Sequence, residues 1–549
     1  MVAEQTDVET RVSQIDAPAT GAELAIAMLE SHGVETVFGI PGVHTLALYD
    51  ALASSRLRHI LARHEQGAGF MADGYARASG KPGVALVITG PGVTNIATAI
   101  GEAYTDSSPI LVLSSNNRRE HLDAMRGNLH DLKDQLAVMA AVTKWNTRVM
   151  HAADVPAALG EAFQHLFSGR PLPVHVEFPL DVLDEPAPFA TLPQPTRPRR
   201  LQPDPAAIAT AVERLKQATR VAIYCGGGAV QAEAGDHILA LAERLGAPVV
   251  TSIMGKGAVP EDHPLSLGAL WSPGNEVDAI LRDADCLVVF GSKLGAQATD
   301  DFRFPIPAEL IRVDVDEREL TLNAQPSVAI LGDAALAAEG MIQLLSVENY
   351  TANSFSRDRI AAARAQAQTT SWHAERRPYI DALRRAIPRD GIAVTDMTQL
   401  SYVACGLYPV YEPRTYMFPS GYGTLGFALP AAIGAKIARP EAAVVAVVGD
   451  GGFQFTMSEL GTAVQERLGI PIVIFNDSCY SAVKENQALS RGSRYVAVDL
   501  VNPDYVDLGR AYRIPGVRVD TPESLEAAIG EALSRDLPTI IDVPIEPWV

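Results

Sequence analysis

The sequence predicts an α/β protein of three domains, each a doubly wound parallel sheet covered by helices. Helix-like and strand-like segments alternate from about Gly21 onward, which is typical of parallel sheets with crossover helices. The strand candidates are short apolar runs, as expected for strands buried on both faces. Two stretches without periodicity interrupt the alternation, and a chain of 549 residues is too long for one core.

The first domain is predicted to cover residues 18–184. Its first helix lies in GAELAIAMLESHG, and its strands lie in VETVFGIPG, GVALVITGPG and PILVLSS. The following stretch, DEPAPFATLPQPTRPRRLQPDP, is rich in proline and has no periodicity. We therefore predict a linker there.

The second and third domains are predicted at residues 204–345 and 372–549, with the connector SVENYTANSFSRD near their junction. Strand candidates of the second domain are RVAIYCGGG, APVVTSI, CLVVFGS and LIRVDVD. Its segment YCGGGAVQ does not match GxGxxG and has no partner acid at the expected distance. It therefore predicts a tight turn rather than a dinucleotide site.

The overall charge and the cysteine pattern exclude several classes of protein. The balance of 45 Lys and Arg against 65 Asp and Glu gives a net charge of −20, which disfavours binding to nucleic acids and anionic membranes. The four cysteines form no CxxC pair, so a disulfide framework or zinc site is not expected. We see neither a signal peptide nor an apolar run of about 18 residues, and we expect a cytoplasmic protein.

Two strand ends in the stretch from Gly449 to Tyr480 indicate a metal site. The apolar runs AAVVAVVG and IPIVIF end in Gly449-Asp450-Gly451-Gly452 and Asn476-Asp477. Between them, Leu460, Ala463, Val464 and Leu468 share one helical face, and Thr456 with Glu459 fits a capping box. In such a βαβ unit both strand ends lie at one sheet edge. Asp450, Asp477 and a main-chain carbonyl near Cys479 can then bind one Mg²⁺ that holds a diphosphate.

These motifs resemble those of thiamine-diphosphate enzymes, in which GDG is followed in the next strand by NN. RHEQGAGFMADGYARASGKPGVALVITGPGVTN is similar to the pyrimidine-binding domain of acetolactate synthases and 2-oxo acid decarboxylases, and SGYGTLGFALPAAIGAK is similar to their cofactor-shaping segment. The resemblance covers nearly the whole chain and implies pyrimidine-binding, middle and diphosphate-binding domains. It implies thiamine diphosphate and Mg²⁺ as cofactors. Acetolactate synthases also hold FAD in the middle domain, but nothing in this sequence demands FAD.

The resemblance assigns roles to individual residues. Glu65 would hydrogen-bond a ring nitrogen of the aminopyrimidine, and burial in a cofactor cleft can raise the pKa of such an acid. Gly423 would offer its carbonyl to the 4′-amino group, and Leu425 would hold the two cofactor rings in a bent conformation. The other cofactor contacts would be Thr398, Gln399, Gly449, Asp450, Gly451, Gly452, Asp477, Cys479 and Tyr480, with Asp450, Asp477 and Cys479 at the metal.

The chain departs from the family pattern at the substrate side. Asn476-Asp477 replaces two asparagines, and LSSNNRREH lacks the His-His pair of pyruvate decarboxylases. Val43 stands at their acidic position beside His44, and Val483 stands at the position of their later glutamate. His44 and His130 are therefore the candidates for proton transfer, with a merely structural role as the alternative for each.

The expected activity is decarboxylation of a 2-oxo acid to an aldehyde. The alternatives are a carboligase of the acetolactate synthase type and an inactive regulatory subunit, although the latter would be expected to lose Glu65 or the metal motif. The segments FGIPGVHT, RGNLHDL and PSGYGTLG resemble those of 5-guanidino-2-oxopentanoate (2-ketoarginine) decarboxylases. A guanidinium needs a carboxylate partner. The candidate substrate residues are Val43, His44, Asp131 and Glu485, with Asp134 as a further acid.

The resemblance also predicts assembly. In this family the pyrimidine and diphosphate halves of one site come from different subunits. We therefore expect a homodimer at least, and a tetramer built as a dimer of dimers.

Overall fold

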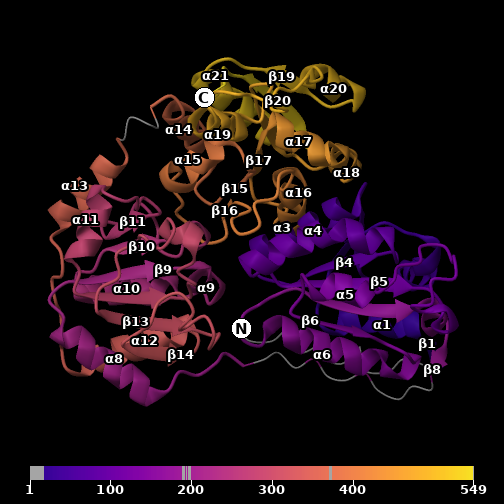
Figure 1. Ribbon diagram of the computed structural model, residues 1–549, viewed down its shortest axis with the longest axis horizontal. Coiled ribbons are helices and arrows are strands. Elements are labelled where there is room, and N and C mark those ends of the chain that lie inside the picture. Colours follow the sequence, from indigo (N-terminus) through magenta and orange to yellow (C-terminus); the bar gives the residue numbers. More distant parts are fainter. Residues whose placement is uncertain (1–17, 188–191, 193–194, 196–198, 370–373, 548–549) are drawn as a thin grey trace, which may run out of the picture. The chain divides into compact units, whose positions relative to one another are not determined.

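The computed structural model describes residues 18–187, 192, 195, 199–369 and 374–547 (Figure 1). It contains three six-stranded sheets, in which every neighbouring pair of strands is parallel. The predicted fold class is therefore confirmed. The predicted domain boundaries stay a prediction.

The first sheet has the strand order β3-β2-β4-β5-β7-β6. Its strands are β2 (Thr36–Gly39), β3 (Arg58–Leu61), β4 (Gly83–Val87), β5 (Ile110–Asn116), β6 (Trp145–Arg148) and β7 (Val174–Pro179). Its helices are α1 (Gly21–Ser31), α2 (Leu46–Ala53), α3 (Glu65–Ser79), α4 (Pro91–Asp106), α5 (Gln135–Ala140), α6 (Val155–Phe167) and α7 (Leu180–Leu183). The short strands β1 (Ala19–Thr20) and β8 (Pro186–Ala187) pair antiparallel. The strand order reverses between β2 and β4, and open α/β sheets bind ligands at such reversals.

The middle sheet has the order β11-β10-β9-β12-β13-β14. Its strands are β9 (Val221–Cys225), β10 (Val249–Thr251), β11 (Ser266–Gly268), β12 (Cys286–Phe290), β13 (Glu309–Asp314) and β14 (Val328–Leu331). Its helices are α8 (Pro205–Gln217), α9 (Gly227–Gln231), α10 (Gly235–Leu245), α11 (Glu276–Asp283), α12 (Ala334–Val347) and α13 (Arg357–Ala367). The predicted tight turn after β9 is wrong, because α9 begins there at once. Gly226 and Gly228 instead allow this helix start to pack on the backbone of Gly291.

The third sheet has the order β16-β15-β17-β18-β20-β19. Its strands are β15 (Ile392–Thr395), β16 (Tyr416–Met417), β17 (Val444–Gly449), β18 (Pro471–Asn476), β19 (Gly516–Arg518) and β20 (Thr539–Pro544). Its helices are α14 (Arg377–Ala386), α15 (Gln399–Leu407), α16 (Ala428–Ala438), α17 (Asp450–Thr456), α18 (Leu460–Gln465), α19 (Ser481–Arg491), α20 (Tyr505–Ala511) and α21 (Pro522–Leu533). Here the order reverses between β15 and β17.

The described chain divides into two compact units. The first comprises the described residues of Met1–Pro198 with Ile433–Ala438 and Ser458–Glu466. The second comprises those of Arg199–Ala432, Arg439–Met457 and Arg467–Val549. Helix α18 thus packs with the first domain, although its sequence lies in the third.

Two features of the described chain bear on its class. All four cysteines, Cys225, Cys286, Cys405 and Cys479, are buried free thiols. Within the residues described, no helix combines the length and the apolar character needed to cross a membrane.

Candidate active site

Two carboxylates lie at neighbouring strand ends of the third sheet. β17 and β18 pair in a register that sets Gly449 beside Phe475, so Asp450 and Asp477 follow adjacent strands. Asp450 is only 2% exposed. Burial raises the pKa of Asp450 to about 6, and the charge of Asp477 adds to this rise. The structure therefore brings these two predicted metal ligands together.

The chemistry of this pair fits a hard divalent cation. In the part of the chain that the structure describes, no three His, Cys, Asp or Glu side chains gather into a metal site. Two carboxylates and a main-chain carbonyl leave several coordination positions for other oxygens. This is the set that Mg²⁺ uses when it bridges protein and phosphate groups.

Asn502 is a site residue that the sequence analysis missed. Its Nδ2 lies 2.6 Å from Oδ2 of Asp450 and 3.0 Å from Oδ1 of Asn476. Nδ2 of Asn476 in turn donates to Oδ1 of Asp542 at 3.1 Å. Asn502 follows α19 and belongs to neither strand-end motif, so no spacing rule pointed to it.

Asp477 also shapes the turn that leads into α19. Its carboxylate accepts the backbone N–H of Cys479 at 3.1 Å and the hydroxyl of Ser481. Ser478 has a φ of 56°, in the left-handed region, so the chain reverses sharply here. The ring of Tyr480 lies against Gly451, where an added Cβ would be 2.6 Å from the ring. The predicted contact Tyr480 thus lies against a glycine of the first motif, and Cys479 is held beside Asp477.

The predicted capping box between β17 and β18 is wrong. The segment is not one helix but α17, a short 3₁₀ turn at Met457–Glu459, and α18. The hydroxyl of Thr456 donates to the carbonyl of Gly426 at 2.8 Å. The carboxylate of Glu459 accepts the backbone N–H groups of Arg63 and His64 at 3.0–3.1 Å. Tertiary partners have replaced the local capping interactions.

Asp396 organises the segment that contains Gly423 and Leu425. This carboxylate follows β15, is fully buried, and accepts the N–H groups of Met397, Gly426 and Ala428 at 2.7, 3.1 and 3.0 Å. Burial raises the pKa of Asp396 to about 6. The sequence analysis missed this residue, although an acid directly after the apolar run GIAVT was the available signal.

The two predicted cofactor contacts Thr398 and Gln399 have different neighbours. Thr398 lies beside Gly449 of the first metal motif, and Gln399 lies beside Glu485, the candidate partner of the substrate. The Oγ1 of Thr398 would be 3.0 Å from a Cβ at Gly449. Nε2 of Gln399 donates to Glu485 at 3.1 Å, and its Oε1 accepts from Arg376 at 2.6 Å. Burial lowers the pKa of Arg376, while the charge of Glu485 opposes this. Glu485 therefore already has an amide and a buried cation nearby.

In the first unit, Glu65 is the first residue of α3. Its Oε2 accepts a hydrogen bond from Nδ2 of Asn95 at 2.9 Å. A Cβ at Gly67 would lie 2.2 Å from Oε1 of Glu459, so only glycine lets that carboxylate reach the start of the helix. Asn95 and Glu459 are thus supports of the predicted catalytic glutamate that the sequence analysis did not assign.

His44 and His130 come together near the strand-order reversal of the first sheet. Their ring centroids are 5.5 Å apart with an edge-on orientation. His44 is 6% exposed and its Nε2 lies 3.2 Å from Oδ1 of Asn117. Burial is the main cause that lowers the pKa of His44. The backbone of His130 is in the left-handed region, with a φ of 64°. The side chain of Val43, the candidate next to His44 in the sequence, is 58% exposed.

The two acids of NLHDLKDQ already have partners within the chain. Asp131 accepts a hydrogen bond from the side chain of Asn117 and two from backbone N–H groups. Asp134 accepts the N–H of Ala137 at 3.0 Å and caps the N-terminus of α5.

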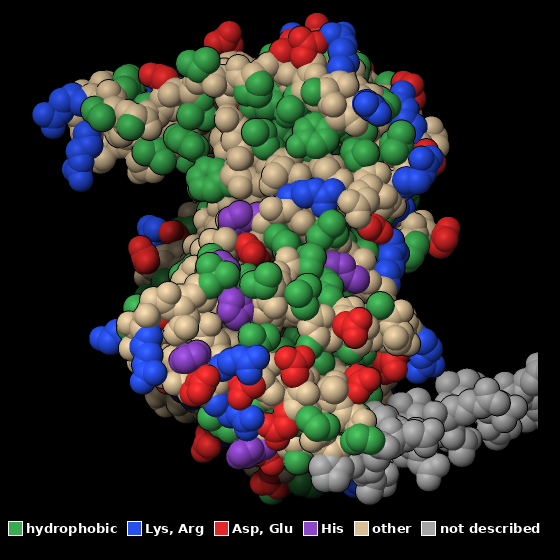
Figure 2. Space-filling view, turned by 90° about the vertical axis from the view of Figure 1, so that its right-hand side faces the viewer, with side chains coloured by type: hydrophobic (Ala, Val, Ile, Leu, Met, Phe, Trp, Pro, Cys, Tyr) green, Lys and Arg blue, Asp and Glu red, His purple; other side chains and the backbone are tan. Residues whose placement is uncertain are grey.

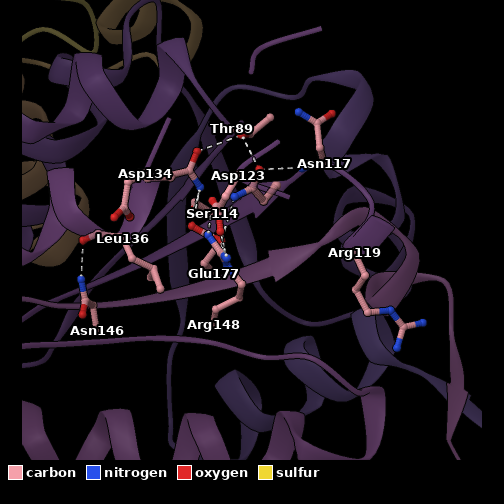
Figure 3. A network of polar contacts seen from close by, with 12 residues as sticks. Thr89, Ser114, Asn117, Arg119, Asp123, Asp134, Leu136, Asn146, Arg148 and Glu177 are labelled. Atoms are coloured by element: carbon pink, nitrogen blue, oxygen red, sulfur yellow. Dashed lines mark hydrogen bonds and ion pairs between the residues drawn. The ribbon is translucent and has the colours of Figure 1, made fainter. Parts of the chain in front are cut away.

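A buried polar network supports the turn after β4 (Figure 3). The fully buried Glu177 pairs with Arg148, which points toward it in Figure 3, and accepts from Nε2 of Gln135 at 2.9 Å. Oε1 of Gln135 accepts from the hydroxyl of Thr89 at 2.8 Å and the N–H of Gly90 at 2.9 Å. No motif in the sequence indicated this network, because its members come from distant segments.

Comparison with known proteins identifies matching families along most of the chain. Family models described as the N-terminal TPP binding, central and C-terminal TPP binding domains of thiamine pyrophosphate enzymes match residues 19–138, 208–341 and 396–543. A probable 2-ketoarginine decarboxylase of Pseudomonas aeruginosa is 42% identical over 94% of this chain and 91% of its own length. The large subunit of acetolactate synthase isozyme 3 of Escherichia coli is 35% identical over 94% and 92%. A probable acetolactate synthase large subunit of Methanocaldococcus jannaschii is 32% identical over 96% and 92%.

Proposed function

Since this chain belongs to the family of thiamine pyrophosphate enzymes, we propose that it decarboxylates 5-guanidino-2-oxopentanoate (2-ketoarginine) to an aldehyde and CO₂. The observation that carries the choice of substrate is the 42% identity, over 94% of the chain, to a probable 2-ketoarginine decarboxylase. The relatives named acetolactate synthases, at 32–35% identity, favour the carboligase as the second candidate.

The residues of the site divide the work of holding the cofactor. Asp450 and Asp477, with the carbonyl of Cys479, would hold Mg²⁺ and through it the diphosphate. Glu65, fixed by Asn95, would bind a ring nitrogen of the aminopyrimidine. Gly423 and Leu425, in the segment ordered by Asp396, would set the conformation of the two rings. When bound, thiamine diphosphate supplies the electron sink for decarboxylation; no FAD is needed for this chemistry.

The guanidinium of the substrate requires an acidic partner. Glu485 is the acid we assign to it, because Asp131 and Asp134 are taken up by backbone N–H groups and by Asn117. Glu485 is half-buried, accepts a hydrogen bond from the neutral amide of Gln399 at 3.1 Å, and has the buried cation Arg376 nearby. A carboxylate hydrogen-bonded to an amide keeps oxygen lone pairs for a guanidinium fork.

We also propose that the working enzyme is a homodimer or a tetramer of two dimers. Only Ser481 of α19 is buried, and Val483, Leu489, Val496 and Val501 on this helix and the following segment are 51–100% exposed. Figure 2 shows hydrophobic side chains gathered near the top of that view, over the C-terminal elements. Apolar surface next to a metal motif fits a second copy of the chain that completes the site.

We also propose that the enzyme works in the cytoplasm. Its four buried free cysteines suit a reducing compartment.

The proposed function is tested with the purified protein, thiamine diphosphate and Mg²⁺. CO₂ release and product identity are measured for 5-guanidino-2-oxopentanoate, 2-oxohexanoate and pyruvate. We expect the highest kcat/KM for the guanidino acid, with its aldehyde as the product. Formation of acetolactate from pyruvate without reaction of the guanidino acid would replace the decarboxylase by the carboligase.

A further inference from the structure

His44 is buried, and only one of its two ring nitrogens has a hydrogen-bond partner among the described residues. Its Nε2 lies 3.2 Å from Oδ1 of Asn117. Its Nδ1 is buried and has no hydrogen-bond partner among the residues that the structure describes. A buried polar atom without a partner is costly, so Nδ1 is set up for a group that the protein does not itself supply.

The amide of Asn117 can take only one orientation. Its Nδ2 lies 3.0 Å from Oδ1 of Asp131 and 3.3 Å from the carbonyl oxygen of Leu129. An ionised carboxylate and a carbonyl only accept hydrogen bonds, so the NH₂ end must face them. The oxygen end must then face His44.

Asp131 is itself locked in this role. Its other oxygen, Oδ2, accepts the backbone N–H groups of Gly127 and Asn128, both at 2.9 Å. With donors on both oxygens, the carboxylate acts purely as an acceptor. The fixed carboxylate of Asp131 therefore also fixes the orientation of the Asn117 amide.

We propose that Asp131 and Asn117 are positioning residues that hold His44 as the Nε2–H tautomer, so that Nδ1 acts as a base toward the bound 2-oxo acid. The amide oxygen of Asn117 only accepts, and therefore Nε2 must carry the proton. The proton in question is that of the hydroxyl which the former 2-oxo oxygen would carry once CO₂ has left. On release of the aldehyde this proton would move to Nδ1, the O–H electron pair would form the C=O bond of the aldehyde, and the bond from that carbon to the cofactor would break. The imidazolium keeps its bond to Asn117. This inference rests on the proposed function.

The surroundings of His44 connect it to the predicted catalytic glutamate. A Cβ at Gly90, whose φ is 66°, would lie 2.6 Å from the carbonyl oxygen of His130. A Cβ at Gly92 would lie 3.6 Å from Oε1 of Glu65. Gly90 and Gly92, at the start of α4, thus come close to the backbone of His130 and to the carboxylate of Glu65. The titratable groups around His44 are His130, edge-on to it, and Asp131 behind Asn117; burial favours its neutral form by lowering its pKa.

The tautomer is tested directly by ¹⁵N spectra of the full-length protein labelled in its histidine rings, with His44→Gln to assign the signals. We expect a pyridine-type Nδ1 and a pyrrole-type Nε2 for His44. In Asp131→Asn, the backbone N–H groups of Gly127 and Asn128 should keep the side-chain oxygen of the new asparagine. The NH₂ group of that asparagine then faces Asn117, so the amide of Asn117 should rotate by 180° and present its own NH₂ group to His44. The two signal types of His44 should then interchange. A matched control, Asp50→Asn, removes an exposed acid from α2 and should leave them unchanged.

Kinetics complete the test. Asp131→Asn should lower kcat for the guanidino acid about 100-fold with little change in KM, as expected when a general base is disabled. A second variant, Asn117→Ala, removes the acceptor that faces Nε2. It should also lower kcat for the guanidino acid with little change in KM, because the tautomer of His44 is then no longer fixed. A pyrrole-type Nδ1 in the wild type, or unchanged spectra and kcat in Asp131→Asn, would overturn the proposal. If the predicted tautomer and its interchange appear but no 2-oxo acid is decarboxylated, the proposed function fails separately, and with it the role of Nδ1 as a base.

Discussion

At Asp450, burial and metal binding favour different forms of the carboxyl group. Burial favours the protonated form, whereas a metal ion binds the ionised form. Its carboxylate is almost fully enclosed and accepts hydrogen bonds from the amide of Asn502 and from the backbone of Gly451 and Ser478. The charge of Asp477 also disfavours its ionised form, and a cation between the two carboxylates would relieve this repulsion. Asp396, another buried acid of this sheet, accepts backbone N–H groups and serves as a structural acceptor.

Metal affinity should fall as the pH is lowered through about 6. Burial raises the pKa of Asp450 from 3.8 to about 6, so below that pH the carboxyl is protonated and must lose its proton to bind a metal. We expect Mn²⁺, as a paramagnetic substitute for Mg²⁺, to bind about tenfold more weakly at about pH 5 than at about pH 7.5. Electron paramagnetic resonance of free Mn²⁺, without diphosphate, measures this. Asp450→Asn should bind weakly at both pH values; the same pH dependence in that variant would contradict the assignment.

Glu485→Gln should reduce selectivity for the cationic substrate. Removing the partner of a desolvated charge costs about 3 kcal/mol or more, which is roughly 100-fold in kcat/KM. Turnover of 2-oxohexanoate, which has no charge on its side chain, serves as the internal control and should change little. Equal losses for both substrates would show that Glu485 supports the fold through Gln399 rather than binding the guanidinium.

At the scale of elements, α3 depends on a carboxylate from a distant part of the chain. Glu459 is fully buried, and it takes the N–H groups of Arg63 and His64 just before Glu65. The hydroxyl of Thr462 also donates to it at 2.7 Å. The end of the 3₁₀ turn before α18 thus fixes where α3 begins, and with it the position of the predicted catalytic acid.

Glu459→Gln should therefore destabilise the protein and reduce its activity. Loss of the negative charge weakens the buried hydrogen bonds from the N–H groups of Arg63 and His64, and we expect the free energy of unfolding to drop by about 2 kcal/mol. Chemical denaturation measures this loss. The matched control is Glu466→Gln on the same segment, whose partner Arg58 is half-exposed, and it should cost less than about 1 kcal/mol. Similar losses for both variants would refute the special role of Glu459.

At the scale of the whole molecule, the predicted catalytic residues are divided between the two compact units. Glu65 lies in the first unit, and Asp450 and Asp477 lie in the second. If sites are shared between subunits, each site takes Glu65 from one chain and the metal ligands from another. This arrangement allows a test by mixing defective chains.

Glu65→Gln and Asp450→Ala should each be inactive alone and partly active when mixed. A heterodimer would hold one site with both lesions and one intact site, so up to half of the heterodimers' sites recover. Activity is measured after subunit exchange has been verified by native mass spectrometry. The double variant mixed with Glu65→Gln is the control and should stay inactive. No recovery in the first mixture would mean that each chain builds its own site.

Local sequence patterns determined the fold class and the two ends of the metal motif. Buried parallel strands read as continuous apolar runs, and the carboxyl ends of neighbouring strands meet at one edge, so Asp450 and Asp477 could be paired from the sequence. Glu65 was assigned through its flanking segment, and the assignment stays a prediction. The candidates His44 and His130 were named from separate segments without any sign that their rings meet.

Only the tertiary structure decided which polar groups support these residues. Asn502, Asp396, Asn95 and Glu459 act across long stretches of chain, and no spacing rule reaches that far. The capping box at Thr456 and Glu459 failed for the same reason, because a local hydrogen bond was exchanged for partners in other segments. The tautomer of His44 is the clearest case. It depends on the direction of one amide, which is set by Asp131 and the backbone around Gly127, and hydrogen-bond direction is a property of three-dimensional neighbours rather than of sequence.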